Sequence, residues 1–396
     1  MHLVLVSSEF PPGPGGIGTH AHQLAQRLST RGWRVTVLTP QEYAPDIEIQ
    51  CFNSAQVFEV ESLPKLPSAA LKALQRYTAV VRRIKRDRPD VLLATGERAV
   101  WVVSAALRGT SIPWVAVGHG SEFTVVPSWE RQLVRRSFNR ASAIIAVSRF
   151  TLGLIEACGI VPRRAAVITN GADETVFRRL SAIEVAETRS AFGFGSEPLL
   201  LTAGNVTDRK GQELVIRAMP GILARHPNTR YLMAGLPTQQ PKLQRLAEEL
   251  GVSRQVHFLG RIPGENLVRL MNAADLFVLT SRTTDTGDCE GFGIAVIEAA
   301  LCGKAAVVSS GSGLSESVVD GETGICVPEG DAEAVGRAVS DVIANPHLRT
   351  KLELAAEARA MRTYTWTKVA ASYEEFLLTL ILAGRSVSPV TAEEVS

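Results

Sequence analysis

Two glutamates eight residues apart carry the strongest chemical signal in this sequence. Glu290 stands directly before a Gly-Phe-Gly stretch at 291–293, and Glu298 follows on the far side of it. The glycines let the main chain approach a ligand closely, and the unpaired amides of residues 292–294 at a helix start would suit a phosphate. The two carboxylates could then accept hydrogen bonds from hydroxyls on either side of that anion. A diphosphate flanked by two polyols describes a nucleotide-sugar.

The elements around this pair can be read from the hydrophobic pattern. The apolar run 275–280 predicts a buried strand, and residues 294–301 predict a helix that ends at Gly303. A polar loop, 281–288, joins them. The first carboxylate is therefore expected just before the turn into the helix, and the second about one turn inside it.

Composition limits the classes of protein to consider. A chain of 396 residues with 45% hydrophobic residues suits two globular domains, and no apolar run is long enough to span a bilayer. The five cysteines show no C-x-x-C spacing, so reduced thiols are expected rather than disulfides or a zinc site. The net charge is +2, and basic residues are not interleaved with aromatic ones, so no nucleic-acid partner is expected.

Strand-like and helical patterns alternate along the chain, which predicts an α/β fold with parallel sheets. Strands are expected near residues 2–7, 34–39, 90–94, 113–117, 142–147, 165–169, 199–203, 230–234, 256–259, 276–280 and 305–309. Helices are expected near residues 17–30, 68–87, 97–107, 128–138, 149–157, 181–192, 211–225, 241–250, 264–272, 294–302, 331–343, 346–361 and 368–382.

The pattern of the two glutamates resembles the mark of the retaining glycosyltransferases of family 4. Their mark is a glutamate, seven residues and a second glutamate, with Phe-Gly after the first. The resemblance implies that Glu290 faces the donor sugar and Glu298 holds the ribose hydroxyls. It also implies the GT-B fold, in which two Rossmann-like domains face each other across a cleft. The expected parts are an acceptor domain (1–175), a donor domain (176–365), a helix crossing back to the first domain (366–383) and a disordered tail (384–396).

A glycine-rich loop follows the first predicted strand. Gly13, Gly15 and Gly18 satisfy G-x-G-x-x-G, but the second strand does not end in the acidic residue that a dinucleotide site requires, because Glu42 lies beyond a proline. A dehydrogenase is therefore the weakest alternative. The family resemblance implies instead that the amides of Gly15 and Gly16 reach the donor diphosphate.

His119 stands between two glycines at the end of a predicted strand, where ligands bind in open α/β sheets. The resemblance implies that this histidine contacts the donor sugar, and we do not interpret it as a general base. The segment 256–263 also ends a strand. There the resemblance implies that the main chain of Arg261 and Ile262 pairs with the edge of the base.

The segment 200–211 is again a strand, a loop and a helix start. The family pattern places an arginine and then Lys-Gly here, so that two cations neutralise the diphosphate; Lys210 and Gly211 match, whereas Asn205 stands where the arginine is expected. Either Arg209 supplies the missing charge, or Asn205 donates a neutral hydrogen bond and Lys210 acts alone. We favour the second explanation because neighbours at a helix start point about 100° apart.

Two basic helices are predicted in the first half of the chain. Six basic residues lie between 76 and 88, among them Arg82, Arg83 and Arg86, and four between 131 and 140. These residues could form a solvated surface or contact an anionic membrane that carries a lipid-linked acceptor. Asp285 and Asp288 lack further ligands nearby, so no metal is expected.

The resemblance to family 4 implies a metal-independent, retaining hexosyltransferase with no cofactor, and we expect it to be cytoplasmic or peripheral on the inner face of the membrane. The donor would be a UDP-hexose rather than a GDP-hexose, with glucose the best guess, and the acceptor a hydroxyl of a glycan, glycolipid or lipid-linked sugar. A sugar-nucleotide 2-epimerase and a catalytically weak nucleotide-sugar-binding subunit are the alternatives. The expected catalytic residues are His119, Lys210 and Glu290; the expected diphosphate-binding residues are Gly15, Gly16, Asn205, Lys210, Phe292, Gly293 and Ile294.

Overall fold

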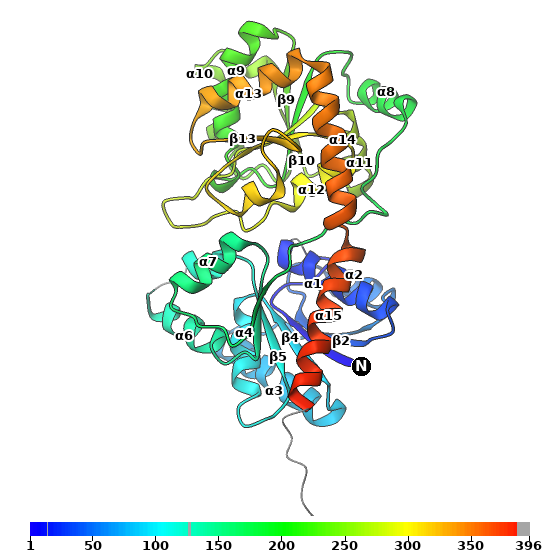
Figure 1. Cartoon of the computed structure of the whole chain (residues 1–396), viewed down its shortest axis with the longest axis vertical. Coiled ribbons are helices and arrows are strands. Elements are labelled where there is room, and N and C mark those ends of the chain that lie inside the picture. The colour runs from blue at the N-terminus through cyan, green and yellow to red at the C-terminus, as the bar shows by residue number, and fades with distance from the viewer. Residues whose placement is uncertain (14, 126–127, 386–396) are drawn as a thin grey trace, which may run out of the picture. The chain divides into compact units, whose positions relative to one another are not determined.

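The computed structural model describes residues 1–13, 15–125 and 128–385. The chain divides into two compact units, each built on a parallel sheet with helices (Figure 1). Among the described residues, the first unit comprises 1–147, 151–168 and 369–385, and the second comprises 148–150 and 169–368. The predicted α/β class with parallel sheets is confirmed.

The first unit contains a seven-stranded sheet in the order β3-β2-β1-β4-β5-β6-β7. Its strands are β1 (His2–Ser7), β2 (Arg34–Pro40), β3 (Glu59–Leu63), β4 (Val91–Thr95), β5 (Trp114–Gly118), β6 (Ala143–Ala146) and β7 (Ala165–Val167). Its helices are α1 (Gly16–Thr30), α2 (Asp46–Ser54), α3 (Ala69–Asp87), α4 (Glu97–Ala106), α5 (Ser121–Thr124), α6 (Ser128–Phe138) and α7 (Arg149–Ala157).

The second unit contains a six-stranded sheet in the order β10-β9-β8-β11-β12-β13. Its strands are β8 (Leu199–Ala203), β9 (Arg230–Ala234), β10 (Val256–Gly260), β11 (Leu276–Leu279), β12 (Ala306–Ser309) and β13 (Gly324–Val327). Its helices are α8 (Ala182–Ala191), η1 (Asp208–Lys210), α9 (Gln212–Arg225), α10 (Gln240–Glu249), η2 (Ser253–Gln255), α11 (Gly264–Ala273), α12 (Ile294–Leu301), η3 (Gly313–Ser317), α13 (Ala332–Ala344) and α14 (Pro346–Thr363).

The order of strands reverses once in each sheet, and this positions the loops of interest. In the second unit the chain runs from β8 through β9 to β10 on one side, and then from β11 to β13 on the other. In the first unit the corresponding reversal lies between β1 and β4. Loops that leave the carboxyl ends of such neighbouring strands diverge, which opens a place for a ligand.

Apart from the three 3-10 helices, two strands and two α-helices were not predicted from the sequence. The strands β3 and β13 lie at the edges of their sheets, and the helices α2 and α5 are short. The sequence of β3, Glu-Val-Glu-Ser-Leu, contains three polar or acidic side chains among five and is only partly buried. It lacks the continuous apolar run that reveals the central strands.

The last helix, α15 (Trp366–Arg385), begins in the second unit and from Val369 belongs to the first. In Figure 1 it lies beside α1, and the Tyr373 hydroxyl is 3.0 Å from Nε2 of His20 on α1. The helix includes residues 384 and 385, which were assigned to a tail; residues 386–396 of that tail lie outside the described residues. Within the described part of the chain, no helix is long and apolar enough to cross a membrane.

Candidate functional site

The loops that carry Lys210 and Glu290 leave two neighbouring strands at the reversal point of the second sheet. β8 pairs with β11 through Leu200 and Leu201, so the loops after both strands start side by side. The predicted strand–loop–helix arrangement around the two glutamates is present, with β11, the loop 280–293 and α12 in sequence.

The loop after β8 is fixed closely against the end of β11. Gly211 caps α9 in the left-handed conformation, with φ of 68°. A Cβ at this position would lie 1.8 Å from the carbonyl oxygen of Thr280, whose Oγ1 donates a hydrogen bond to the carbonyl of Gly211 at 2.7 Å. Only glycine fits at this close approach. The contact of Gly211 with Thr280 therefore places the side chains of Arg209 and Lys210 next to the loop that carries Glu290.

Two cations converge on one carboxylate at this place. Lys210 Nζ lies 2.8 Å from Glu290 Oε2, and Arg209 Nη1 lies 2.5 Å from the same oxygen. Arg209 also reaches Asp288, with 3.2 Å between Nε and the carboxylate. We call these four residues the Glu290 ion group.

The expectation that Arg209 points away from Lys210 is wrong. Residues 208–210 form a separate 3-10 turn that ends at the left-handed Gly211, so they are not the first turn of α9 and the angular argument does not apply. The Arg209 carbonyl accepts a hydrogen bond from the Arg282 amide at 2.8 Å, which holds the turn against the loop after β11. The long guanidinium side chain then reaches Glu290.

The two glutamates of the motif have opposite electrostatic environments. Burial alone would raise the pKa of Glu290, but Lys210 and Arg209 more than offset this and leave its pKa below the usual value. Burial raises the pKa of Glu298 to about 7, with only a small opposing effect from Lys210. Glu290 is therefore ionised at neutral pH, whereas Glu298 is near its titration midpoint.

The N-terminus of α12 is formed by a sharp glycine turn. Gly293 caps the helix with φ of 89°, no side chain caps it, and a Cβ on Gly293 would lie 2.5 Å from Leu314 Cδ1. The amides of Phe292, Gly293 and Ile294 have no acceptor among the described residues. These amides are therefore free for the predicted contact with an anion, while the Phe292 ring packs against Tyr364 at 5.5 Å.

Asn205 is exposed in the loop after β8, and its amide oxygen accepts a hydrogen bond from the Leu236 amide at 3.3 Å. This contact ties the loop after β8 to the loop after β9. The predicted contact of Asn205 with a phosphate would have to come from its amide nitrogen.

The predicted base-binding residues follow β10. Arg261 is exposed and Ile262 half-buried. The carbonyl of the preceding Gly260 accepts a hydrogen bond from the Gly235 amide at 2.8 Å, so this segment is tied to the loop after β9. The main chain of both residues makes no hydrogen bond within the described residues and can pair with a base edge.

His119 lies in the first unit, directly after β5. Its Nε2 is 2.7 Å from Thr95 Oγ1 at the end of β4, and its ring packs edge-on against His20 at 5.1 Å. Burial lowers the pKa of His119 to about 4, so its imidazole is neutral at physiological pH. A neutral ring held in this way can donate or accept a hydrogen bond but is not a cation.

Glu122, which was not predicted, holds the turn that presents His119. Its carboxylate is buried and accepts hydrogen bonds from the amides of His119 and Gly120 at 2.6 and 2.8 Å. The spacing His-Gly-x-Glu was a signal for this, since a carboxylate close after a glycine turn often caps the freed amides.

Glu122→Gln should lower the free energy of unfolding by about 1–3 kcal/mol, because the amide group must turn a donor toward one of the two N–H groups. Thermal and denaturant unfolding would measure this. Glu156→Gln, at an exposed position of α7, is the control and should have no such effect. Equal stability of the two variants would contradict the positioning role.

The glycine loop of the first unit carries a carboxylate of its own. Gly15 and Gly16 are exposed at the start of α1, and a Cβ on Gly15 would lie 2.1 Å from Glu9 Oε2. Burial raises the pKa of Glu9, against a smaller opposite effect of a hydrogen bond from the Gly18 amide. Glu42 pairs with Lys72 at 2.7 Å, so it supports the packing of α3 rather than a dinucleotide ribose.

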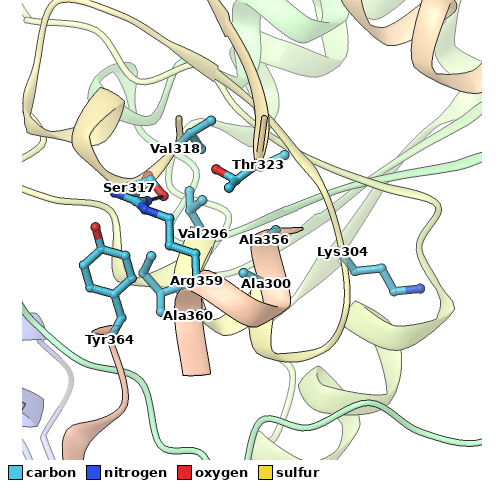
Figure 2. Close-up of a pocket in the computed structure, with 12 residues that line it drawn as sticks. Val296, Ala300, Lys304, Ser317, Val318, Thr323, Ala356, Arg359, Ala360 and Tyr364 are labelled. Carbon is cyan, nitrogen blue, oxygen red and sulfur yellow. Dashed lines mark hydrogen bonds between the residues drawn. The ribbon is translucent and has the colours of Figure 1, made fainter. Parts of the chain in front are cut away.

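A small cavity of about 10 Å³ lies elsewhere in the second unit, between α12 and α14. Its lining includes Val296 and Ala300 of α12 and Ala356 and Ala360 of α14 (Figure 2). It has room for about one water molecule, and no predicted site residue lines it. It is a packing gap between these two helices.

Asp288 joins the Glu290 ion group, and the described residues contain no cluster of three or more metal ligands.

Two family models match consecutive parts of the chain. The model described as Glycosyltransferase Family 4 matches residues 14–176, and the model described as Glycosyl transferases group 1 matches residues 185–359. The chain belongs to glycosyltransferase family 4. The Glu290–Glu298 motif that first suggested this family lies within the second match.

Relatives of this family 4 glycosyltransferase match over nearly the whole chain. A GDP-mannose-dependent alpha-(1-6)-phosphatidylinositol monomannoside mannosyltransferase of Mycolicibacterium smegmatis is 29% identical, covering 95% of this chain and 98% of the relative. A glycogen synthase of Mycobacterium tuberculosis is 27% identical, covering 98% and 97%.

Solved structures confirm the GT-B fold of the glycosyltransferase. HepE of Anabaena, in complex with UDP, superposes with a TM-score of 0.81 at 22% identity, covering 96% of this chain and all of HepE. Sucrose-phosphate synthase of Thermosynechococcus elongatus gives a TM-score of 0.79 at 21% identity, covering 96% and 99%. The roles assigned to individual residues stay predictions, including those of Gly15, Gly16 and His119 in the first unit.

Proposed function

We propose that this glycosyltransferase transfers a hexose from a nucleoside-diphosphate sugar to a hydroxyl of a glycan or lipid-linked acceptor, with retention of configuration and without a metal ion. The observation that carries the proposal is the convergence of Lys210 and Arg209 on Glu290, at the strand reversal and next to the uncapped start of α12. Cations and helix-start amides together suit a diphosphate.

The reaction places new negative charge on the diphosphate as the bond to the anomeric carbon breaks. Lys210 and the amides of Gly293 and Ile294 stabilise that charge from fixed positions. The acceptor hydroxyl then attacks the same face of the sugar and gives its proton to the departing phosphate oxygen. Glu298 accepts the ribose hydroxyls and holds the nucleotide in place.

GDP-mannose is the first donor to test. Three relatives, which are 24–29% identical, are named GDP-mannose-dependent mannosyltransferases, and they match nearly end to end. The HepE structures with UDP and UDP-glucose are only 21–22% identical and so support the fold alone. A UDP-hexose, which the sequence favoured, is the second candidate, since backbone contacts at Arg261 and Ile262 do not distinguish the bases.

A donor panel tests this proposal directly. Purified protein would be incubated with GDP-mannose, UDP-glucose or UDP-N-acetylglucosamine, with and without a bacterial lipid extract. The expected result is release of nucleoside diphosphate that depends on lipid, with the donor's anomeric configuration kept in the product. Conversion of UDP-N-acetylglucosamine without acceptor would favour the epimerase, and slow hydrolysis that ignores acceptor would favour the weak binding subunit.

A surface of the first unit supports a lipid-borne acceptor. Leu71 and Leu74 on α3 and Leu133 on α6 are 40–59% exposed, and both helices also carry exposed basic residues. Exposed leucines flanked by cations are typical of helices that lie on anionic membranes. Arg83 is not available for such a contact, because it is buried and paired with Glu59, Glu61 and Asp87.

We therefore expect binding to acidic liposomes through the exposed side chains of Arg82, Lys85, Arg131 and Arg136. The protein should float with acidic vesicles at low salt and be released at high salt. Reversing these four charges to glutamate should abolish flotation, whereas reversing Arg225 and Arg337 of the second unit should not. Equal flotation of both variants would assign the four residues to a solvated surface.

A further inference from the structure

Arg209 takes part in none of the reaction steps described above, yet it contacts the same carboxylate oxygen as Lys210. We infer that Arg209 is a second cation of the donor site, which leaves Glu290 and binds the diphosphate when the donor enters. This inference rests on the proposed function and extends it to a residue at a position where the family pattern has no cation.

The balance of charge in the ion group carries the argument. The diphosphate of a nucleotide-sugar brings two negative charges, and Lys210 alone would neutralise one of them. In the structure both cations are held by Glu290, whose side chain is only 12% exposed. A guanidinium can contact phosphate and carboxylate oxygens through different N–H groups, so Arg209 could keep Asp288 while it turns toward the donor.

Other cations near the loop are held elsewhere. Lys242 pairs with Asp208 at 2.9 Å, and Arg282 Nε donates to the carbonyl of Asp208 at 3.1 Å. The Asp208 carboxylate also accepts a hydrogen bond from the side-chain amide of Gln239. Arg209 is therefore the cation besides Lys210 that, within the described residues, reaches Glu290.

The exchange also gives Glu290 a defined task. A carboxylate that has two cations in the unliganded protein loses one of them when the diphosphate arrives. Its oxygen then becomes available to accept a hydrogen bond from a hydroxyl of the donor sugar. The movement of Arg209 to the diphosphate thus neutralises the leaving group and also frees the Glu290 oxygen that accepts a hydrogen bond from the sugar hydroxyl.

Calorimetric binding of GDP, UDP and their nucleosides to wild type and Arg209→Ala tests the inference. Loss of a charge-assisted hydrogen bond should weaken the preferred diphosphate by about 10- to 100-fold. Binding of the corresponding nucleoside should change by less than about twofold. Arg209→Lys should recover part of the loss, and Arg217→Ala, an exposed arginine of α9 paired with Glu213, should behave like wild type.

The outcomes separate this inference from the proposed function. Wild type that binds no nucleoside diphosphate would overturn both. Tight binding by wild type with an unchanged Arg209→Ala variant would overturn the inference alone. Equal losses for diphosphate and nucleoside would also contradict it, because Arg209 would then act only through the fold of the loop.

Discussion

Lys210→Ala should lower kcat/KM for the donor by about 10²- to 10³-fold, the usual effect of removing one preorganised stabiliser of a developing oxyanion. The ammonium lies 2.8 Å from Glu290 in a loop that cannot shift, because Gly211 is packed against the carbonyl of Thr280. The lost charge therefore cannot be replaced by movement of the main chain. Single-turnover kinetics with the preferred donor would measure the effect.

Lys242→Ala is the matched control for this experiment. Lys242 is a more exposed lysine that pairs with Asp208 at the rim of the same loop. Its removal should change kcat/KM by less than about threefold, since an exposed ion pair contributes little. A loss below tenfold for Lys210→Ala, or an equal loss for Lys242→Ala, would contradict the role of Lys210.

Glu298→Gln should weaken binding of the nucleotide-sugar strongly, because an amide oxygen is a poorer acceptor than a carboxylate for two ribose hydroxyls. Each charge-assisted hydrogen bond contributes about 1.5–3 kcal/mol. Calorimetry at pH 8 would measure the loss, and affinity within about threefold of wild type would contradict ribose binding by Glu298.

The same residue gives binding a pH dependence with a defined sign. Burial raises the pKa of Glu298 to about 7, and the ribose prefers the ionised form. Affinity of wild type for the nucleotide-sugar should therefore fall as pH drops below 7 and level off above it, with proton release on binding. Glu298→Gln should lose this dependence. A nucleotide-sugar is the suitable probe because its diphosphate does not titrate in this range.

The contribution of Glu298 to the free energy of unfolding should fall as pH rises, whereas the affinity for the nucleotide-sugar should rise. Because the folded pKa of Glu298 lies above its ordinary value of 4.5, its favourable contribution is complete at low pH and is lost as pH rises to about 7. Glu298→Gln should thus stabilise the protein at pH 8 by on the order of 1–2 kcal/mol, after allowance for partial exposure, and by much less at pH 5. If Glu298→Gln gained no stability at pH 8, burial of the ionised Glu298 carboxylate would not destabilise the folded protein, which would contradict this prediction.

The central part of the fold was predictable because its strands are continuous apolar runs. The strands at 199–203 and 230–234 were placed with their observed bounds, and the glycine turns between strands and helices gave the helix starts. The edge strands β3 and β13 were missed. Glu59 and Glu61 of β3 both pair with Arg83 on α3, a contact that no local pattern reveals.

The site was predictable where a residue type is required by backbone geometry. Gly211 and Gly293 have positive φ values and neighbours that exclude a side chain, so the motif around each is recognisable in the sequence. Arg209 was misplaced because its direction depends on a 3-10 turn held by Arg282 from a distant loop. The caps made by Glu122 and the pKa of Glu298 likewise depend on tertiary burial.

The central claim is that the second unit binds a nucleoside diphosphate mainly through its phosphates at the Glu290 ion group and the start of α12. The most direct measurement is calorimetric comparison of GDP and UDP with guanosine and uridine on wild-type protein. The account predicts that one of the diphosphates binds at least about 100-fold more tightly than its nucleoside, since several charge-assisted hydrogen bonds are added. Equal affinities for the diphosphate and its nucleoside would contradict it.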